Sequence, residues 1–111
     1  MDIDFYQISA ARTAIYPTDC GITYCALGLA NEAGEVAGKI KKQLRDGKTW
    51  SIAEQEVNRG KILDELGDTL WYAAMLASEL GTTLSAVAQR NLTKLQDRSD
   101  RGVIGGSGDT R

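Results

Sequence analysis

The chain has 111 residues, a formal net charge of −2 and no histidine. This length predicts a single domain, residues 1–111. The missing histidine excludes imidazole bases and histidine metal ligands. The lack of a basic run argues against nucleic-acid and membrane partners. The longest uncharged run, residues 20–31, is too short to cross a bilayer.

The first half of the chain has a helical pattern of apolar residues and no period-two strand pattern. A first helix is expected over about Asp4–Ala14, before Pro17 interrupts the pattern. A long second helix is expected over about Cys20–Arg45. Asp46-Gly47 should end it, because glycine suits the left-handed position that follows a helix.

The second half is helical as well. Ser51 and Glu54 form an S-x-x-E capping box at which a helix can begin, and whether this helix merges with the next one through Gly60 stays open. Further along, the expected elements are a third helix over about Arg59–Leu80, a fourth from Thr82 or Thr83 to about Asp100, and a non-helical glycine-rich tail over 102–108.

These elements predict an all-α fold, a four- to five-helix bundle whose two long helices lie antiparallel with their apolar stripes facing. The stripe residues are Ile22, Cys25, Ala26, Leu29, Ala33, Val36, Ile40 and Leu44 on one helix, and Ile62, Leu63, Leu66, Leu70, Ala73, Ala77 and Leu80 on the other. Because a chain this short has a thin core, we expect it to assemble as a homo-oligomer.

Two carboxylate pairs lie on the long helices. Glu32 and Glu35 are three residues apart on one helix, and Glu65 and Asp68 are three apart on the other, so each pair projects from nearly the same face. Antiparallel helices would bring the pairs together, and four oxygen donors suit Mg²⁺ or Mn²⁺. The plainer interpretation is a solvated face with weak ion pairs, which the spacing of one pair alone favours. Two such pairs beside the apolar stripes of neighbouring helices leave both interpretations open.

The residues around these pairs resemble a known family. Glu32-Ala33-Gly34-Glu35 and Glu65-Leu66-Gly67-Asp68, with 29 residues between Glu35 and Glu65, are similar to the E-x-x-E and E-x-x-D motifs of the MazG-like, all-α nucleotide pyrophosphohydrolases. Further along, Asn91-Leu92-Thr93-Lys94 with Arg98 resembles the family's N-x-x-K and arginine, and 101–109 resembles a tail found in many members.

The resemblance implies an enzyme that hydrolyses nucleoside triphosphates, ribo- or deoxyribo-, to the monophosphate and pyrophosphate. Its role would be control or house-cleaning of the deoxynucleotide pool. It implies Glu32, Glu35, Glu65 and Asp68 as ligands of Mg²⁺, with Mn²⁺ as a substitute, and Glu35 as the choice for general base. Relatives acting on dUTP or phosphoribosyl-ATP remain alternatives.

Substrate contacts are assigned to Asn91, Lys94 and Arg98 from this resemblance, and to Lys39 and Tyr72, which lie about one turn past Glu35 and Asp68. Asn91 is expected to face inward, and its alternative role is a structural hydrogen bond. Arg98 suits either a phosphate or a neighbouring acid, and Tyr72 either the nucleotide or an interface. Trp50, in a loop, suits base stacking or a subunit contact.

The family association predicts a homotetramer, a dimer of dimers, with a dimer as the alternative. Non-enzymatic functions also stay open: a helical interaction module whose acidic pairs are simply solvated, or a metal-stabilised protein without turnover. Cys20 and Cys25 form no zinc or redox motif and are expected to be free and reduced. No signal pattern opens the sequence, so a cytoplasmic location is expected.

Overall fold

The computed structural model describes residues 1–47 and 52–111, except for the side chains of 52–55 and 57. The described residues are helical and contain no strand. This part of the chain has four α-helices: α1 Ile3–Ala10, α2 Gly21–Arg45, α3 Ile52–Glu79 and α4 Leu84–Asp100, with 3-10 turns at Ala11–Thr13 and Thr18–Cys20. The all-α prediction is therefore confirmed. Within the described residues, no helix has the length and apolar composition that a membrane span needs.

Local signals fix most helix ends. The Asp2 carboxylate caps α1 by accepting from the backbone N–H groups of Asp4, at 2.8 Å, and Phe5, at 3.0 Å. Gly47 adopts a φ of 64° two residues after α2 ends, in the left-handed region that favours glycine. Thr83 caps α4 through the N–H of Ala86. The ends predicted for α2 and α4 are therefore close to those observed.

The third helix differs from the prediction in one respect. It is continuous from Ile52 through Gly60 to Glu79, so the two predicted segments merge. Gly81, with a φ of 72°, follows its end. The predicted capping contact between Ser51 and Glu54, and the role of Trp50, lie outside the described residues.

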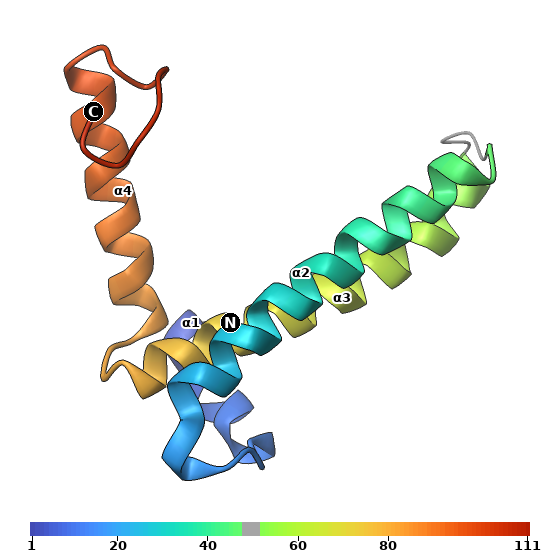
Figure 1. Ribbon diagram of the computed structural model, residues 1–111, viewed down its shortest axis with the longest axis horizontal. Helices are drawn as coiled ribbons and strands as arrows, with labels where there is room; N and C mark the ends of the chain where they lie inside the picture. The colour runs from blue at the N-terminus through green and yellow to red at the C-terminus, as the bar shows by residue number, and fades with distance from the viewer. Residues whose placement is uncertain (48–51) are drawn as a thin grey trace.

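The two long helices form an antiparallel hairpin, and α1 packs beside the end of this hairpin that carries the C-terminus of α3 (Figure 1). Helix α4 leaves that end and points away from the hairpin, so it does not pack along the two long helices of its own chain as the predicted four- to five-helix bundle would require. The buried apolar cluster lies where α1, α2 and α3 meet, and its members are Ala10, Cys25, Ala74 and Met75. The core is therefore concentrated at one end of the molecule.

The predicted stripes are only partly buried. Of these residues, Cys25 and Ala77 are buried, whereas the following are exposed: Ile22, Ala26, Ala33, Leu44, Leu63, Leu66, Leu70 and Leu80. The inward position predicted for these eight is wrong for the single chain. The reason is geometric, because each long helix has one full-length neighbour and a stripe is wider than one helix contact.

Buried polar contacts hold α1 in place. The Gln7 amide donates to Ser78 Oγ at 2.8 Å and to the Thr82 carbonyl at 3.1 Å, and its oxygen accepts from the Leu84 N–H at 2.7 Å. One side chain thus joins α1, the end of α3 and the start of α4. This network orients the N-terminal segment against α3.

Candidate metal centre

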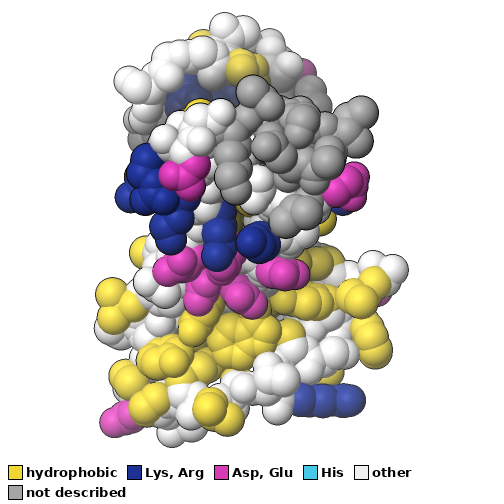
Figure 2. Space-filling view, turned by 90° about the vertical axis from the view of Figure 1, so that its right-hand side faces the viewer, with side chains coloured by type: hydrophobic (Ala, Val, Ile, Leu, Met, Phe, Trp, Pro, Cys, Tyr) yellow, Lys and Arg dark blue, Asp and Glu magenta, His cyan; other side chains and the backbone are white. Residues whose placement is uncertain are grey.

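Three carboxylates converge between the long helices. Glu32 comes from α2, and Glu65 and Asp68 come from successive turns of α3. Each offers an oxygen that lies within 4.8 Å of the other two. In Figure 2 acidic side chains form a band between apolar side chains on one side and basic ones on the other. Such a compact set of hard oxygen donors fits a divalent cation such as Mg²⁺.

Mutual repulsion within this group is visible at Glu32, which is half-buried. Burial raises the pKa of Glu32, and the charges of Asp68, Glu65 and Glu35 raise it further. Lys39 compensates part of this charge, because its Nζ lies 3.4 Å from Glu65 Oε1. A bound cation would relieve the remaining repulsion, so the group also fits a metal electrostatically.

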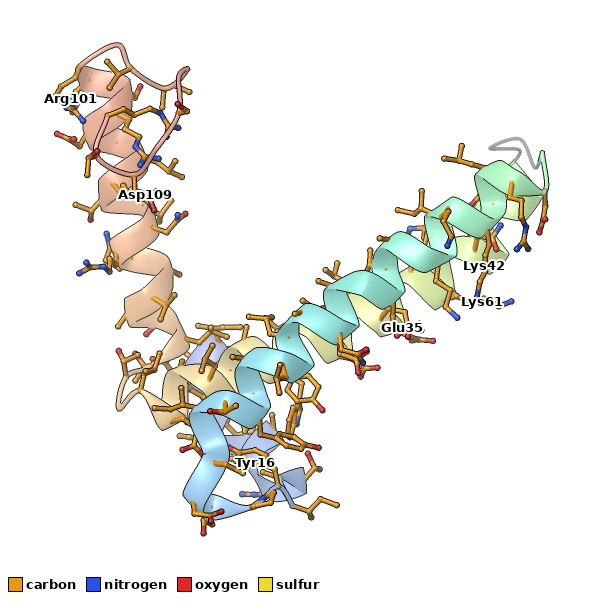
Figure 3. The ribbon with its side chains drawn as sticks, in the orientation of Figure 1. Tyr16, Glu35, Lys42, Lys61, Arg101 and Asp109 are labelled. Carbon is orange, nitrogen blue, oxygen red and sulfur yellow. The ribbon has the colours of Figure 1, made fainter. Side chains whose placement is uncertain are left out.

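Glu35 stands apart from the other three carboxylates. It is exposed on α2, the helix that also carries Glu32 (Figure 3). The group whose oxygens converge within 4.8 Å does not include it. The structure therefore brings together three of the four predicted ligands. Its charge nevertheless acts on Glu32, which places it in the same electrostatic field.

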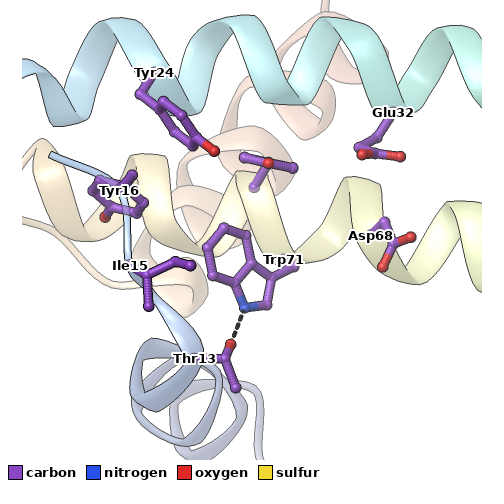
Figure 4. Close-up of a pocket in the computed structure, with 8 residues that line it drawn as sticks. Thr13, Ile15, Tyr16, Tyr24, Glu32, Asp68 and Trp71 are labelled. Carbon is purple, nitrogen blue, oxygen red and sulfur yellow. Dashed lines mark hydrogen bonds between the residues drawn. The ribbon is translucent and has the colours of Figure 1, made fainter.

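A pocket of about 430 Å³ opens beside the carboxylates (Figure 4). Glu32 and Asp68 lie at one end of it. The rest is lined by Thr13, Ile15, Tyr16, Tyr24, Trp71 and Tyr72. An aromatic wall next to oxygen ligands can hold a flat ring and a charged group at the same time.

The aromatic wall is tightly organised. Trp71 meets Tyr72 edge-on with ring centroids 5.0 Å apart, and its Nε1–H donates to Thr13 Oγ1 at 2.9 Å. Tyr72 also lies close to α2, because a Cβ added to Gly28 would lie 2.1 Å from Cε1 of the ring. The ring therefore occupies space that only glycine leaves free on α2.

Sequence reasoning found Tyr72 but missed Tyr16, Tyr24, Trp71 and Thr13 as pocket residues. Trp71 follows the E-x-x-D motif directly, and this proximity was the available signal. Tyr16 and Thr13 reach the pocket only because α1 docks against α3, which no local pattern indicates.

The predicted substrate residues on α4 lie elsewhere. Asn91 is exposed, so its predicted inward position is wrong for the single chain. The side chain of Arg98 is buried and donates to Asp109 at 3.1 Å, while Lys94 Nζ lies 3.4 Å from the same carboxylate. Arg98 was expected to bind either a phosphate or a neighbouring acid, and in the structure it binds the neighbouring acid. Because α4 points away from the hairpin, these residues do not approach the carboxylates of their own chain (Figures 1 and 3).

Comparison with known proteins places this geometry in a family. Residues 22–103 match the model of the MazG nucleotide pyrophosphohydrolase domain, and the chain belongs to this family. The matched region includes α2, α3 and α4, and therefore all four acidic residues of the two motifs.

One relative extends the similarity to the whole chain. It is the Gene 37 protein of Mycobacterium phage L5, which is 54% identical over 117 residues that cover 100% of both chains. No solved structure matches the chain. Thr13, Ile15 and Tyr16 precede the region matched by the family model, so this part of the pocket wall lies outside it.

Proposed function

We propose that the protein hydrolyses nucleoside triphosphates to the monophosphate and pyrophosphate in a reaction that requires Mg²⁺. The observation that carries this proposal is the group formed by Glu32, Glu65 and Asp68, placed beside an aromatic pocket in a member of this family. Mn²⁺ has the same preference for oxygen donors and is the expected substitute.

Each acidic residue has a role in the proposed reaction. Glu32, Glu65 and Asp68 would hold the cation, which supplies charge neutralisation for the polyphosphate and lowers the pKa of water. Glu35 is exposed beside this group and is proposed as the general base that accepts the proton of the attacking water. Glu35 also remains the candidate for a fourth ligand.

The aromatic pocket is proposed to hold the nucleoside. Trp71 and Tyr72 present ring faces and edges on which a base or sugar can pack, and Tyr72 keeps its predicted substrate role. The α-phosphate would then lie at the carboxylate end of the pocket, next to the bond that breaks. Deoxynucleotides are the proposed physiological substrates, with pool control or house-cleaning as the role.

Residues 1–111 are proposed to form one domain that assembles as a homotetramer, with a dimer as the simpler form. The chain exposes 7876 Å², whereas a compact monomer of 12.0 kDa would expose about 6,000 Å². A partner chain would cover part of this surface. In such an assembly, Asn91, Lys94 and Arg98 of one chain would reach a substrate bound to the hairpin of another chain.

Thermal unfolding with Mg²⁺ and a non-hydrolysable α,β-methylene deoxynucleoside triphosphate tests the proposal. Mg²⁺ alone should raise the melting temperature, and the nucleotide should raise it further only when Mg²⁺ is present. Glu65→Gln should lose both shifts. If neither ligand changes the melting temperature of the wild-type protein, the helical interaction module becomes the better account.

A further inference from the structure

A second pocket, of about 180 Å³, lies further along the α2/α3 hairpin, on the side of the carboxylates away from the aromatic pocket. It is called the lysine pocket here, and its lining residues are Lys39, Lys42, Gln43, Asp46, Asn58 and Lys61. Lys42 and Lys61 come from opposite helices and lie near each other toward the free end of the hairpin (Figure 3). Figure 2 shows basic side chains directly beside the acidic band.

The charge of this pocket is positive. Three lysines line it, against one carboxylate, Asp46, which pairs with Arg45 outside the pocket at 2.9 Å. Lys39 also pairs with Glu65, so it links the lysine pocket directly to the candidate metal centre. An anion bound here would therefore lie next to the carboxylates while being attracted by ammonium groups.

Gln43 gives independent evidence for a ligand. Its exposure is 5%, and among the described residues neither its amide nitrogen nor its amide oxygen has a hydrogen-bond partner. Buried polar side chains are normally hydrogen-bonded, because an unpaired buried donor costs free energy. Since Gln43 also lines the lysine pocket, the group that its N–H₂ lacks is expected to be an acceptor bound there.

We propose that the lysine pocket binds the β- and γ-phosphates of the substrate and holds pyrophosphate after cleavage; this rests on the proposed function. Lys42 and Lys61 would attract the phosphate oxygens as point charges, and the Gln43 amide would donate to one of them. The pocket thus takes a diphosphate-type oxyanion.

The order of sites along α2 supports this direction of binding. Tyr24, Glu32 and Lys39 follow each other at intervals of eight and seven residues, which correspond to about 12 Å and about 10 Å along a helix. A nucleotide would therefore place its base at the aromatic pocket, its α-phosphate at the carboxylates and its remaining phosphates at the lysines. Charge and polarity change in the same order along the hairpin.

Titration calorimetry with inorganic pyrophosphate and Mg²⁺ tests the inference, because it measures binding without requiring turnover. Lys42→Gln and Lys61→Gln should each weaken the affinity about ten-fold, as expected for a lost hydrogen bond to a charged group. Lys41→Gln is the matched control, because Lys41 is exposed on α2 and does not line the pocket. Its affinity should stay within about two-fold of the wild type.

Gln43→Leu separates binding from structure. The account predicts weaker pyrophosphate binding with an unchanged or higher melting temperature, because the variant removes an unpaired buried amide. A lower melting temperature with unchanged affinity would assign Gln43 a structural role and overturn its part in the site.

Equal pyrophosphate affinities for Lys41→Gln, Lys42→Gln and Lys61→Gln would overturn the lysine pocket. That result would leave the proposed function intact if the wild type still binds the triphosphate analogue with Mg²⁺. Conversely, a wild type that hydrolyses no nucleoside triphosphate but binds pyrophosphate through Lys42 and Lys61 would contradict the proposed function alone.

Discussion

At the scale of single residues, the main feature is a set of acids held close together against their own charge. The effect is seen at Glu32, where burial and three neighbouring carboxylates raise the pKa. Folding therefore favours protonated Glu32. This contribution to stability is complete below the pKa of the unfolded chain, about 4.3, and is lost as pH rises through the higher pKa of the folded state.

A stability prediction follows for Glu32→Gln, which removes the ionisation but keeps the shape. Without metal, its melting temperature should exceed that of the wild type increasingly as the pH rises from about 4 to about 7.5. Mg²⁺ should reverse the order at neutral pH, because only the wild type retains the full ligand set. Circular dichroism melting with a chelator or with Mg²⁺ measures both effects, and Glu56→Gln, an exposed change on α3, is the control. A constant difference at all pH values would contradict the repulsion.

The sequence predicted which helix faces carry these acids, but it gave little indication of the residues around them. Glu65 and Asp68 are one helical turn apart, so their spacing alone placed them on one face. Gln43 and Tyr16 gave no such signal, because their burial depends on which helices pack together. Glu35 has the same spacing from Glu32, yet it lies outside the group, since spacing fixes the face of a helix and not the reach of a side chain.

At the scale of elements, α2 must approach α3 closely enough to accommodate Tyr72. Gly28→Ala would place a methyl group 2.1 Å from the Tyr72 ring, so the ring or the helix must move. We predict weaker binding of the methylene triphosphate analogue and no gain in stability, measured by calorimetry and by urea unfolding.

Gly34→Ala is the matched change on the same helix; apart from the nearby backbone of α2, none of the described residues has an atom within 4 Å of its added Cβ. It should raise the free energy of unfolding by about 0.5–1 kcal/mol, as expected for alanine in a helix interior. If the Gly28 and Gly34 variants are equal in stability and in binding, the close approach at Tyr72 has no consequence.

The glycine-rich tail is held against α4 by ion pairs. It folds back on α4, where Arg98 and then Lys94 lower the pKa of Asp109 by bonding its carboxylate. The resulting stabilisation is present above the pKa of an unfolded aspartate, about 3.9, and is lost as pH falls through the lower pKa of the folded state. Asp109 therefore anchors the tail at neutral pH.

Asp109→Asn should release residues 102–111 at neutral pH. In amide NMR spectra their signals should move to disordered positions, whereas the wild type should show this change only in acid. Thr110→Ala, next in the chain, should leave the tail in place. A tail that stays folded in Asp109→Asn would show that the backbone turns hold it without the ion pairs.

Element boundaries were largely predictable because capping and glycine signals are local. The continuity of α3 through Gly60 was not, since one glycine lowers helix propensity without ending a helix that packs along a partner. The direction of α4 could not be predicted from the sequence either. It depends on the short turn after Gly81 and on the contacts of Gln7 with Thr82 and Leu84.

At the scale of the whole molecule, the chain is more extended than its length requires. Its radius of gyration is 17.1 Å, compared with about 13 Å for a compact domain of this size. Apolar side chains follow the exposed face of α3, where Leu63, Leu66 and Leu70 line an open groove. A second copy of the chain is the proposed cover for this face.

Sedimentation should therefore give a mass that is a multiple of 12.0 kDa, with four chains favoured over two. Leu66→Arg should shift the protein to smaller species, because a charge would be buried in the contact. Leu66→Met, which conserves volume, should keep the assembly. A wild-type protein that sediments as one chain would refute the oligomer and its role for Asn91.

The central claim is tested most directly by a product assay. The wild type is incubated with Mg²⁺ and a panel of nucleoside triphosphates, and the nucleotide products are separated by ion exchange. The account predicts equal amounts of monophosphate and pyrophosphate, no turnover in Glu65→Gln, a loss of at least about 100-fold in Glu35→Gln, and retained turnover in Lys41→Gln. Formation of diphosphate and orthophosphate, or intact triphosphates with the folded, metal-loaded protein, would contradict it.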